Sequence, residues 1–139
     1  HAGLSARLLE RNLEMDTLNA RMSEGLYRTS KERREDPTLE FLYRSAGPVW
    51  YRGMVCTDEK YDPLTPEQTD ALLRRYDADR LLIGHTIFPD ISTFHDGRVI
   101  AVNVQNERNR RKNRGRAVLI EGSRISVVGN RGVKRVLEE

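Results

Sequence analysis

The sequence predicts an α/β (α+β) fold in which helices come first and a mainly antiparallel sheet with two hairpins follows. Apolar residues recur every three or four positions in the first half of the chain, which is the period of an amphipathic helix. From Ile91 onward, short apolar runs alternate with the turn signals Asp96-Gly97 and Gly122-Ser123, which are typical of two-residue hairpin turns. These two patterns together indicate helices followed by hairpins.

The individual elements follow from their boundary signals. One helix is expected from about Asp16 to Arg33, and Pro37 ends it. Residues 38–43 fit either a helical turn or a short strand, and 45–53 should form an ordered loop that contains Trp50 and Tyr51. Thr65 begins a second helix, because Pro66 follows it and Gln68 completes a capping box. The apolar run Leu81–Ile83 then predicts a buried strand.

Composition limits the class of protein. The 139 residues suffice for one domain or part of one, and with 37% hydrophobic and 32% charged residues no membrane association is expected. The single cysteine, Cys56, excludes an internal disulfide and predicts a small structural side chain. The chain starts at His1, so we expect a piece of a longer protein whose compartment stays unknown.

The stretch Arg108–Arg116, "RNRRKNRGR", holds six cations and no carboxylate. We expect residues 106–115 to form a mobile, solvated connection between the two hairpins, because like charges repel and bury nothing. A nucleic-acid-binding surface is the alternative. It is disfavoured because no aromatic residue is interleaved that could stack on bases.

Two histidines occupy similar sequence contexts. His85 follows the strand Leu81–Ile83 with Gly84 before it and Thr86 after it, and ligands often bind where strands end. His1 opens "HAGLS", which has the same order of histidine and small residues. Two imidazoles at one sheet edge suit a divalent metal, although they do not complete a catalytic site. His95, beside the first hairpin turn, is read as structural.

The motifs "HAGLS", "GPVWYRG" and "GHT" together resemble the calcineurin-like metallophosphoesterases, in particular the bacterial serine/threonine protein phosphatases of the Shewanella-like type. The resemblance implies that residues 1–139 are the C-terminal part of a single four-layer αββα sandwich domain whose N-terminal half is absent. It also implies that His1 and His85 ligate one metal ion and that Arg52 binds the substrate phosphate. No catalytic residue of that family is identifiable in this chain.

The function implied by this resemblance is a metal-dependent phosphoprotein phosphatase. Two divalent ions (Mn, Fe or Zn) would bridge a hydroxide that attacks the phosphomonoester in line. The expected substrates are a phosphorylated protein or a small phosphoester. The motifs that would supply the other ligands do not occur here, so the chain is expected to be inactive alone. The alternatives are a non-catalytic, phosphatase-like scaffold and, less favoured, a nucleic-acid-binding module.

Overall fold

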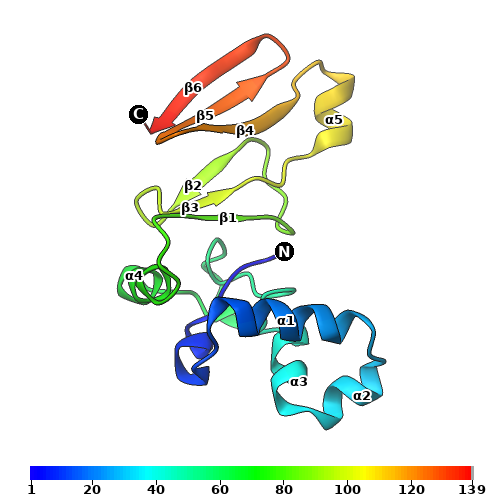
Figure 1. Ribbon diagram of the computed structural model, residues 1–139. Coiled ribbons are helices and arrows are strands. Elements are labelled where there is room, and N and C mark those ends of the chain that lie inside the picture. Colours follow the sequence, from blue (N-terminus) through cyan, green and yellow to red (C-terminus); the bar gives the residue numbers. More distant parts are fainter. Residues whose placement is uncertain (139) are drawn as a thin grey trace. The chain divides into compact units, whose positions relative to one another are not determined.

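The computed structural model describes residues 1–138, without the side chains of Lys134 and Glu138, and it divides into a helical unit, His1–Leu81, and a β unit that begins at Leu82. Figure 1 shows the helical unit in blue to green and the β unit in green to red. The elements of the helical unit are the 3₁₀ helices η1 (Ala6–Arg11) and η2 (Glu59–Tyr61) and the α-helices α1 (Met15–Leu26), α2 (Ser30–Glu35), α3 (Pro37–Tyr43) and α4 (Pro66–Arg75).

The expected single helix from Asp16 to Arg33 is two helices in the structure, α1 and α2. Thr29 separates them, because its hydroxyl accepts from the Glu32 backbone N–H while the Glu32 carboxylate accepts from the Thr29 N–H. This reciprocal cap starts a new helix and so ends the old one. Residues 38–43, which were ambiguous, belong to α3, where Pro37 occupies the first turn and the Asp36 side chain caps the N-terminus.

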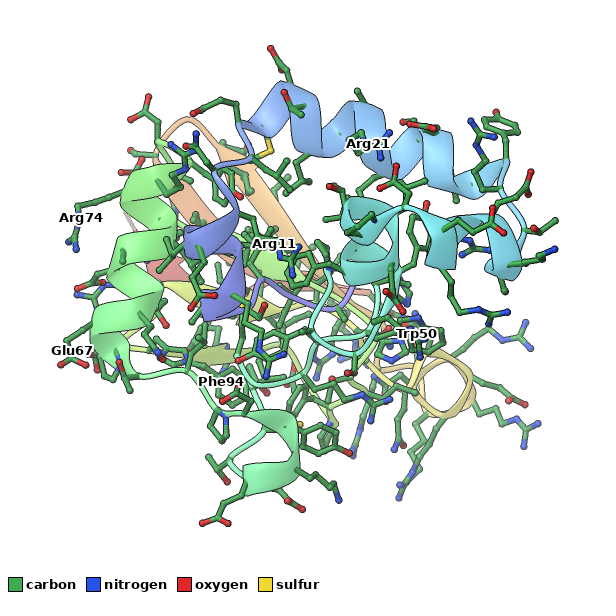
Figure 2. The ribbon with its side chains drawn as sticks, turned by 90° about the horizontal axis from the view of Figure 1, so that it is seen from below. Arg11, Arg21, Trp50, Glu67, Arg74 and Phe94 are labelled. Atoms are coloured by element: carbon green, nitrogen blue, oxygen red, sulfur yellow. The ribbon has the colours of Figure 1, made fainter. Side chains whose placement is uncertain are left out.

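Helices α1 and α3 are joined by polar and close steric contacts. Arg21 of α1, which is labelled in Figure 2, forms ion pairs with Glu24 and with Asp36. The Tyr43 hydroxyl donates a hydrogen bond to the Met22 carbonyl. Its ring lies so close to Gly25 that a methyl group there would overlap it. The sequence of α1 therefore selects a glycine where an aromatic ring of α3 crosses it.

Helix α4 begins as predicted. The Thr65 hydroxyl accepts from the Gln68 N–H at 3.2 Å, and the Gln68 side chain accepts from the Thr65 N–H at 2.9 Å. Leu72 and Leu73 are buried on its inner face, and the buried Thr69, one turn before them, donates its hydroxyl to the Thr65 carbonyl. The capping box predicted from the sequence is confirmed here.

The β unit contains two three-stranded sheets. The first has the order β1-β3-β2, and the second has the order β4-β5-β6. Their core is formed by Ile91, Ile100, Val104, Ile125 and Val127. The strands are β1 (Leu81–Ile83), β2 (Ser92–Phe94), β3 (Val99–Ala101), β4 (Arg116–Glu121), β5 (Arg124–Gly129) and β6 (Gly132–Glu138).

Both predicted hairpins are present and antiparallel. Asp96 and Gly97 have φ values of 54° and 85° in the turn between β2 and β3, where the Arg98 N–H donates to the His95 carbonyl. Gly122, with φ of 62°, turns β4 into β5, so that Glu121 pairs with Arg124. The sequence reading missed β6, which follows β5 through a further turn and pairs with it.

The basic run is more ordered than expected. Residues Asn106–Arg111 form helix α5, which corrects the expected mobile connection over 106–115. Arginine and lysine are good helix formers, and Glu107 pairs with Arg111 one turn later at 2.5 Å. Asn109 is buried, and its carbonyl accepts from the Arg114 N–H at 2.7 Å, which ties the end of the run back to the helix.

The expected architecture, half of a four-layer sandwich, is wrong. The described residues do not form half of a four-layer αββα sandwich: they form a helical unit, and a β unit whose strands lie in two separate sheets. Within residues 1–138, every helix is too short and too polar to cross a membrane.

Candidate functional site

The helical unit contains a pocket of about 440 Å³ on which three cationic side chains converge, and Arg52 is one of them. The pocket draws on η1, on the loop after α3 and on the η2 region, which are distant from one another in the sequence. Its lining residues are Arg7, Ser45, Ala46, Trp50, Tyr51, Arg52, Lys60, Tyr61 and Asp62.

Arg52 is held in place by its two neighbours in the chain. Tyr51 is 3% exposed, and its hydroxyl donates a hydrogen bond to the Asp62 carbonyl. Burial raises the pKa of Tyr51 well above its usual range, so the hydroxyl stays a donor at all physiological pH values. The Gly53 carbonyl accepts from the Leu64 N–H at 3.0 Å. Residues 51–53 are thus fastened to 62–64 on both sides of Arg52.

Gly53 is required by this close approach. A side chain at Gly53 would overlap the Tyr51 hydroxyl and the Asp62 carbonyl. The glycine in "WYRG" therefore serves the packing of the loop, because only a residue without Cβ lets the two segments meet.

The N-terminal segment is attached to the same loop. The Ala2 N–H donates to the Pro48 carbonyl at 2.8 Å, and the buried Ser5 hydroxyl donates to the Ala46 carbonyl at 2.7 Å. The Leu4 N–H also approaches the Met54 sulfur at 3.3 Å. The structure therefore brings together two segments that the sequence singled out, "HAGLS" and "GPVWYRG".

The pocket is electropositive. Three cations, Arg7, Arg52 and Lys60, line it together with one carboxylate, Asp62. Lys60 pairs with Asp58 at 2.9 Å, which raises the pKa of Lys60 through a hydrogen bond and Coulombic attraction. Arg7 makes no ion pair with any residue that the structure describes. An anion would therefore find uncompensated positive charge here.

Aromatic rings stand beside these cations. The Tyr61 ring lies 5.8 Å from the Arg52 guanidinium carbon and 4.9 Å from the Lys60 ammonium. Trp50 is 53% exposed although it is the largest apolar side chain in the sequence (Figure 2). An exposed tryptophan at a pocket edge is typical of a site that takes a ligand with an apolar or aromatic portion.

The two histidines predicted as ligands belong to different units, His1 to the helical unit and His85 to the β unit. His1 is exposed and precedes the segment attached to the Arg52 loop. His85 follows β1 and has a φ of 62°, and the Thr86 N–H donates to the Gly84 carbonyl at 2.7 Å. This is a three-residue γ-turn of the rare kind with positive φ at its centre. His95 also has positive φ and is half-buried beside the first hairpin turn.

The arrangement of the described side chains does not indicate a metal site or a reactive cysteine at the Arg52 pocket. Among the side chains that the structure describes, no group of three or more His, Cys, Asp or Glu is placed to hold a metal ion. Cys56 is half-buried, and its backbone N–H donates to the Arg52 carbonyl at 3.0 Å. The thiol does not line the pocket that contains Arg52.

Sequence reasoning identified Arg52 but missed Arg7 and Lys60. Neither residue stands in a motif, and each is an ordinary surface cation within its own stretch of sequence. Only the folding of η1 and η2 against the loop places them at the same pocket as Arg52. The sequence held one signal for Arg7: it closely follows the motif "HAGLS". In the structure this motif is hydrogen-bonded to the "GPVWYRG" loop, which places Arg7 near Arg52.

Comparisons with known proteins match this chain to solved structures only: no protein-family model and no curated protein matches it. A cold-active protein tyrosine phosphatase of a psychrophilic Shewanella species is 26% identical, with a TM-score of 0.82 over 99% of this chain and 39% of that one. A further structure of a cold-active protein tyrosine phosphatase is 25% identical, with a TM-score of 0.81. The chain therefore spans about two fifths of the length of the structures it matches.

These findings correct the expected family. The matching structures are described as protein tyrosine phosphatases, and none as a calcineurin-like metallophosphoesterase or a serine/threonine phosphatase. The expected pair of divalent metal ions is corrected together with the family that implied it. The described side chains also form no metal-binding cluster. The ligand roles of His1 and His85 depended on those ions, and they stay untested expectations from the sequence.

Proposed function

We propose that this chain carries the phosphate-binding part of a protein phosphatase and that the Arg52 pocket takes the phosphorylated side chain of a protein substrate. The observation that carries the proposal is the convergence of Arg7, Arg52 and Lys60 on one pocket beside aromatic rings. The likeness to cold-active protein tyrosine phosphatases supports it and favours phosphotyrosine as the substrate group.

The chemistry of the pocket suits a phosphorylated aromatic side chain. The Arg52 guanidinium can donate two parallel hydrogen bonds to phosphate oxygens, and Arg7 and Lys60 add positive charge around it. Trp50 and Tyr61 offer surfaces for a phenyl ring. A volume of about 440 Å³ lies within the range of pockets that bind small ligands.

The role in hydrolysis follows from the same charges. Attack of water on the phosphorus atom breaks the ester bond, and negative charge builds on the phosphoryl oxygens in the transition state. Positive groups that are already in place stabilise this charge without reorganising. Arg52 is the residue to which we assign this contact, because its loop is fixed at both neighbours by Tyr51 and Gly53.

We propose further that the chain works as one segment of a longer phosphatase, since it corresponds to 38–39% of the matched chains. On this view other segments supply the groups that activate water, and residues 1–139 alone bind a phosphorylated side chain without hydrolysing it. A phosphatase-like protein that only binds phosphoproteins is the alternative. Turnover by the longer protein decides between the two.

The test compares Arg52→Lys and Arg52→Ala with wild type in binding of a tyrosine-phosphorylated peptide. Lysine keeps the charge but cannot donate to two oxygens, so both variants should bind more weakly. We expect a loss of about tenfold to a hundredfold for Arg52→Ala, as for one charge-assisted hydrogen bond.

Arg74→Ala is the matched control, because Arg74 is exposed and points away from α4 into solvent (Figure 2). Equal affinities of wild type and Arg52→Ala would overturn the proposal. Binding of the unphosphorylated peptide with the same affinity would also overturn it, since the proposed pocket recognises the phosphate.

A further inference from the structure

A second pocket of the helical unit, with a volume of about 210 Å³, is also lined by arginines. It lies along α2, α3 and the residue that follows α3, and it shares no lining residue with the Arg52 pocket. Its lining residues are Ser30, Arg33, Arg34, Glu40, Tyr43 and Arg44. The sequence reading assigned no function to any of them.

Arg33 is held in a fixed orientation in this pocket. Its guanidinium lies over the Tyr43 ring, 4.5 Å from the ring centroid, and its Nε donates to the Arg28 carbonyl at 3.1 Å. Tyr43 is itself fixed by its hydrogen bond to Met22 and by its contact with Gly25. Both terminal nitrogens of Arg33 are left without a hydrogen-bond partner among the atoms that the structure describes.

The other two arginines differ in their pairing. Arg44 pairs with Glu40 at 3.0 Å, one helical turn away. Arg34 is exposed and makes no hydrogen bond or ion pair with any described residue. Three guanidinium groups and one carboxylate give the pocket a net charge of +2 (3 − 1). This charge matches that of a doubly ionised phosphoryl group, which carries about −1.5 to −2 at pH 7.

We propose that this pocket is a second anion site that binds a phosphoryl group. Arg33 and Arg34 would donate to its oxygens, Arg44 would add charge at the rim, and the Ser30 hydroxyl would donate one more hydrogen bond. Clusters of arginine are the usual means by which proteins recognise phosphorylated segments. The group can come from inorganic phosphate or from a phosphorylated peptide, and the experiment separates these two sources.

The experiment is a residue-resolved NMR titration of the 139-residue chain at constant ionic strength. The probes are inorganic phosphate, a singly phosphorylated peptide and the same peptide without phosphate. We expect saturable shifts in residues 30–44 with both phosphorylated probes and none with the third. Tighter binding of the peptide than of phosphate identifies a docking site for phosphoproteins, and equal binding identifies a site for free phosphate.

Arg34→Ala is the decisive variant, because removing a side chain without partners leaves the fold intact. It should weaken the shifts in residues 30–44 by about tenfold or more, as for loss of a charged hydrogen-bond donor. Arg33→Lys should weaken them too, since lysine lacks the planar fork. Arg74→Ala should leave the affinity unchanged, and equal urea midpoints for all four proteins establish that they are folded.

The Arg52→Ala variant separates this proposal from the proposed function. Shifts in residues 30–44 should persist in Arg52→Ala while those in 45–62 are lost. If phosphate shifts only residues 45–62 and Arg34→Ala changes nothing, the second site is overturned and the first stands. If chloride at equal ionic strength reproduces the shifts in residues 30–44, the effect is general screening and the second site is again overturned.

Discussion

The Tyr51 hydroxyl donates a hydrogen bond to the backbone carbonyl of Asp62, eleven residues later in the chain. This bond closes the loop that bears Arg52 onto the segment that bears Lys60 and Tyr61. The buried phenol of Tyr51 is thus one of the contacts that hold the candidate phosphate pocket together.

Tyr51→Phe should lower the free energy of unfolding by about 1–2 kcal/mol, because it leaves the Asp62 carbonyl without its donor while keeping the buried ring. It should also weaken phosphopeptide binding, since residues 51–53 and 60–62 are then less firmly joined. Urea unfolding and a binding titration measure the two effects. Tyr27→Phe is the control, because Tyr27 is 90% exposed and its hydroxyl can be removed without such a loss.

Gly53→Ala should lower the free energy of unfolding by about 1–3 kcal/mol, as other overpacking substitutions do. The added methyl group would overlap the Tyr51 hydroxyl and the Asp62 carbonyl, so the two segments would have to separate. Thr57→Ala, in the exposed part of the same loop, should change stability by less than about 0.5 kcal/mol. If Gly53→Ala is as stable as wild type, the close contact between residues 51–53 and Asp62 does not require a glycine.

Stability should depend on pH through Asp36. The Arg21 guanidinium hydrogen-bonded to Asp36, together with the Leu39 N–H, holds the pKa of this carboxyl below its ordinary value of 3.8. The stabilisation is therefore present above the unfolded-state pKa and is lost as the pH falls through the lowered folded-state pKa.

Asp36→Asn tests this dependence, because asparagine still caps α3 but carries no charge. Thermal unfolding between pH 2 and pH 6 (roughly the range over which paired carboxylates titrate) should show a smaller loss of stability on acidification in this variant. Arg21→Gln should reduce the pH dependence as well, and the double variant should differ little from either single one. Identical pH profiles of wild type and Asp36→Asn would contradict the expectation.

Cys56→Ser should leave the turnover of the phosphatase that contains this chain within about twofold of wild type, since only a reactive thiolate would make serine a poor substitute. The reason is positional: the thiol does not line the pocket that contains Arg52. A steady-state assay with a phosphotyrosine peptide measures the effect. Complete loss of turnover with an unchanged unfolding midpoint would instead assign Cys56 to the chemistry.

Elements with local signals could be predicted from the sequence. The capping box of Thr65 and Gln68 and the Asp96-Gly97 turn each depend on neighbouring residues, and both are where they were expected. The split between α1 and α2 was missed, although the pair Thr29 and Glu32 carried the same capping signal. Helix α5 was missed because its charge was read as a reason for mobility.

The candidate site was only partly predictable, because most of it depends on contacts between distant segments. Arg52 stood in a motif, but Arg7 precedes it by 45 positions and reaches the pocket only when η1 folds. The arginines of the second pocket depend likewise on α3 placing Tyr43 beneath Arg33. Charge alone could not separate these residues from the other cations of a basic chain.

The hydrogen bonds that join segments of the helical unit differ in sequence separation, and therefore in the length of the loop that each one closes. Arg21 and Asp36 are 15 positions apart, and Tyr43 and Met22 are 21 apart, whereas Ser5 and Ala46 are 41 apart and Leu4 and Met54 are 50 apart. Shorter loops close at a lower entropic cost and form earlier in folding. We therefore expect α1 and α3 to pack against each other first, and the N-terminal segment to join the Arg52 loop last. In hydrogen exchange, the Leu4 amide should open more readily than that of Leu18, so the binding pocket can come apart while the helices beside it persist.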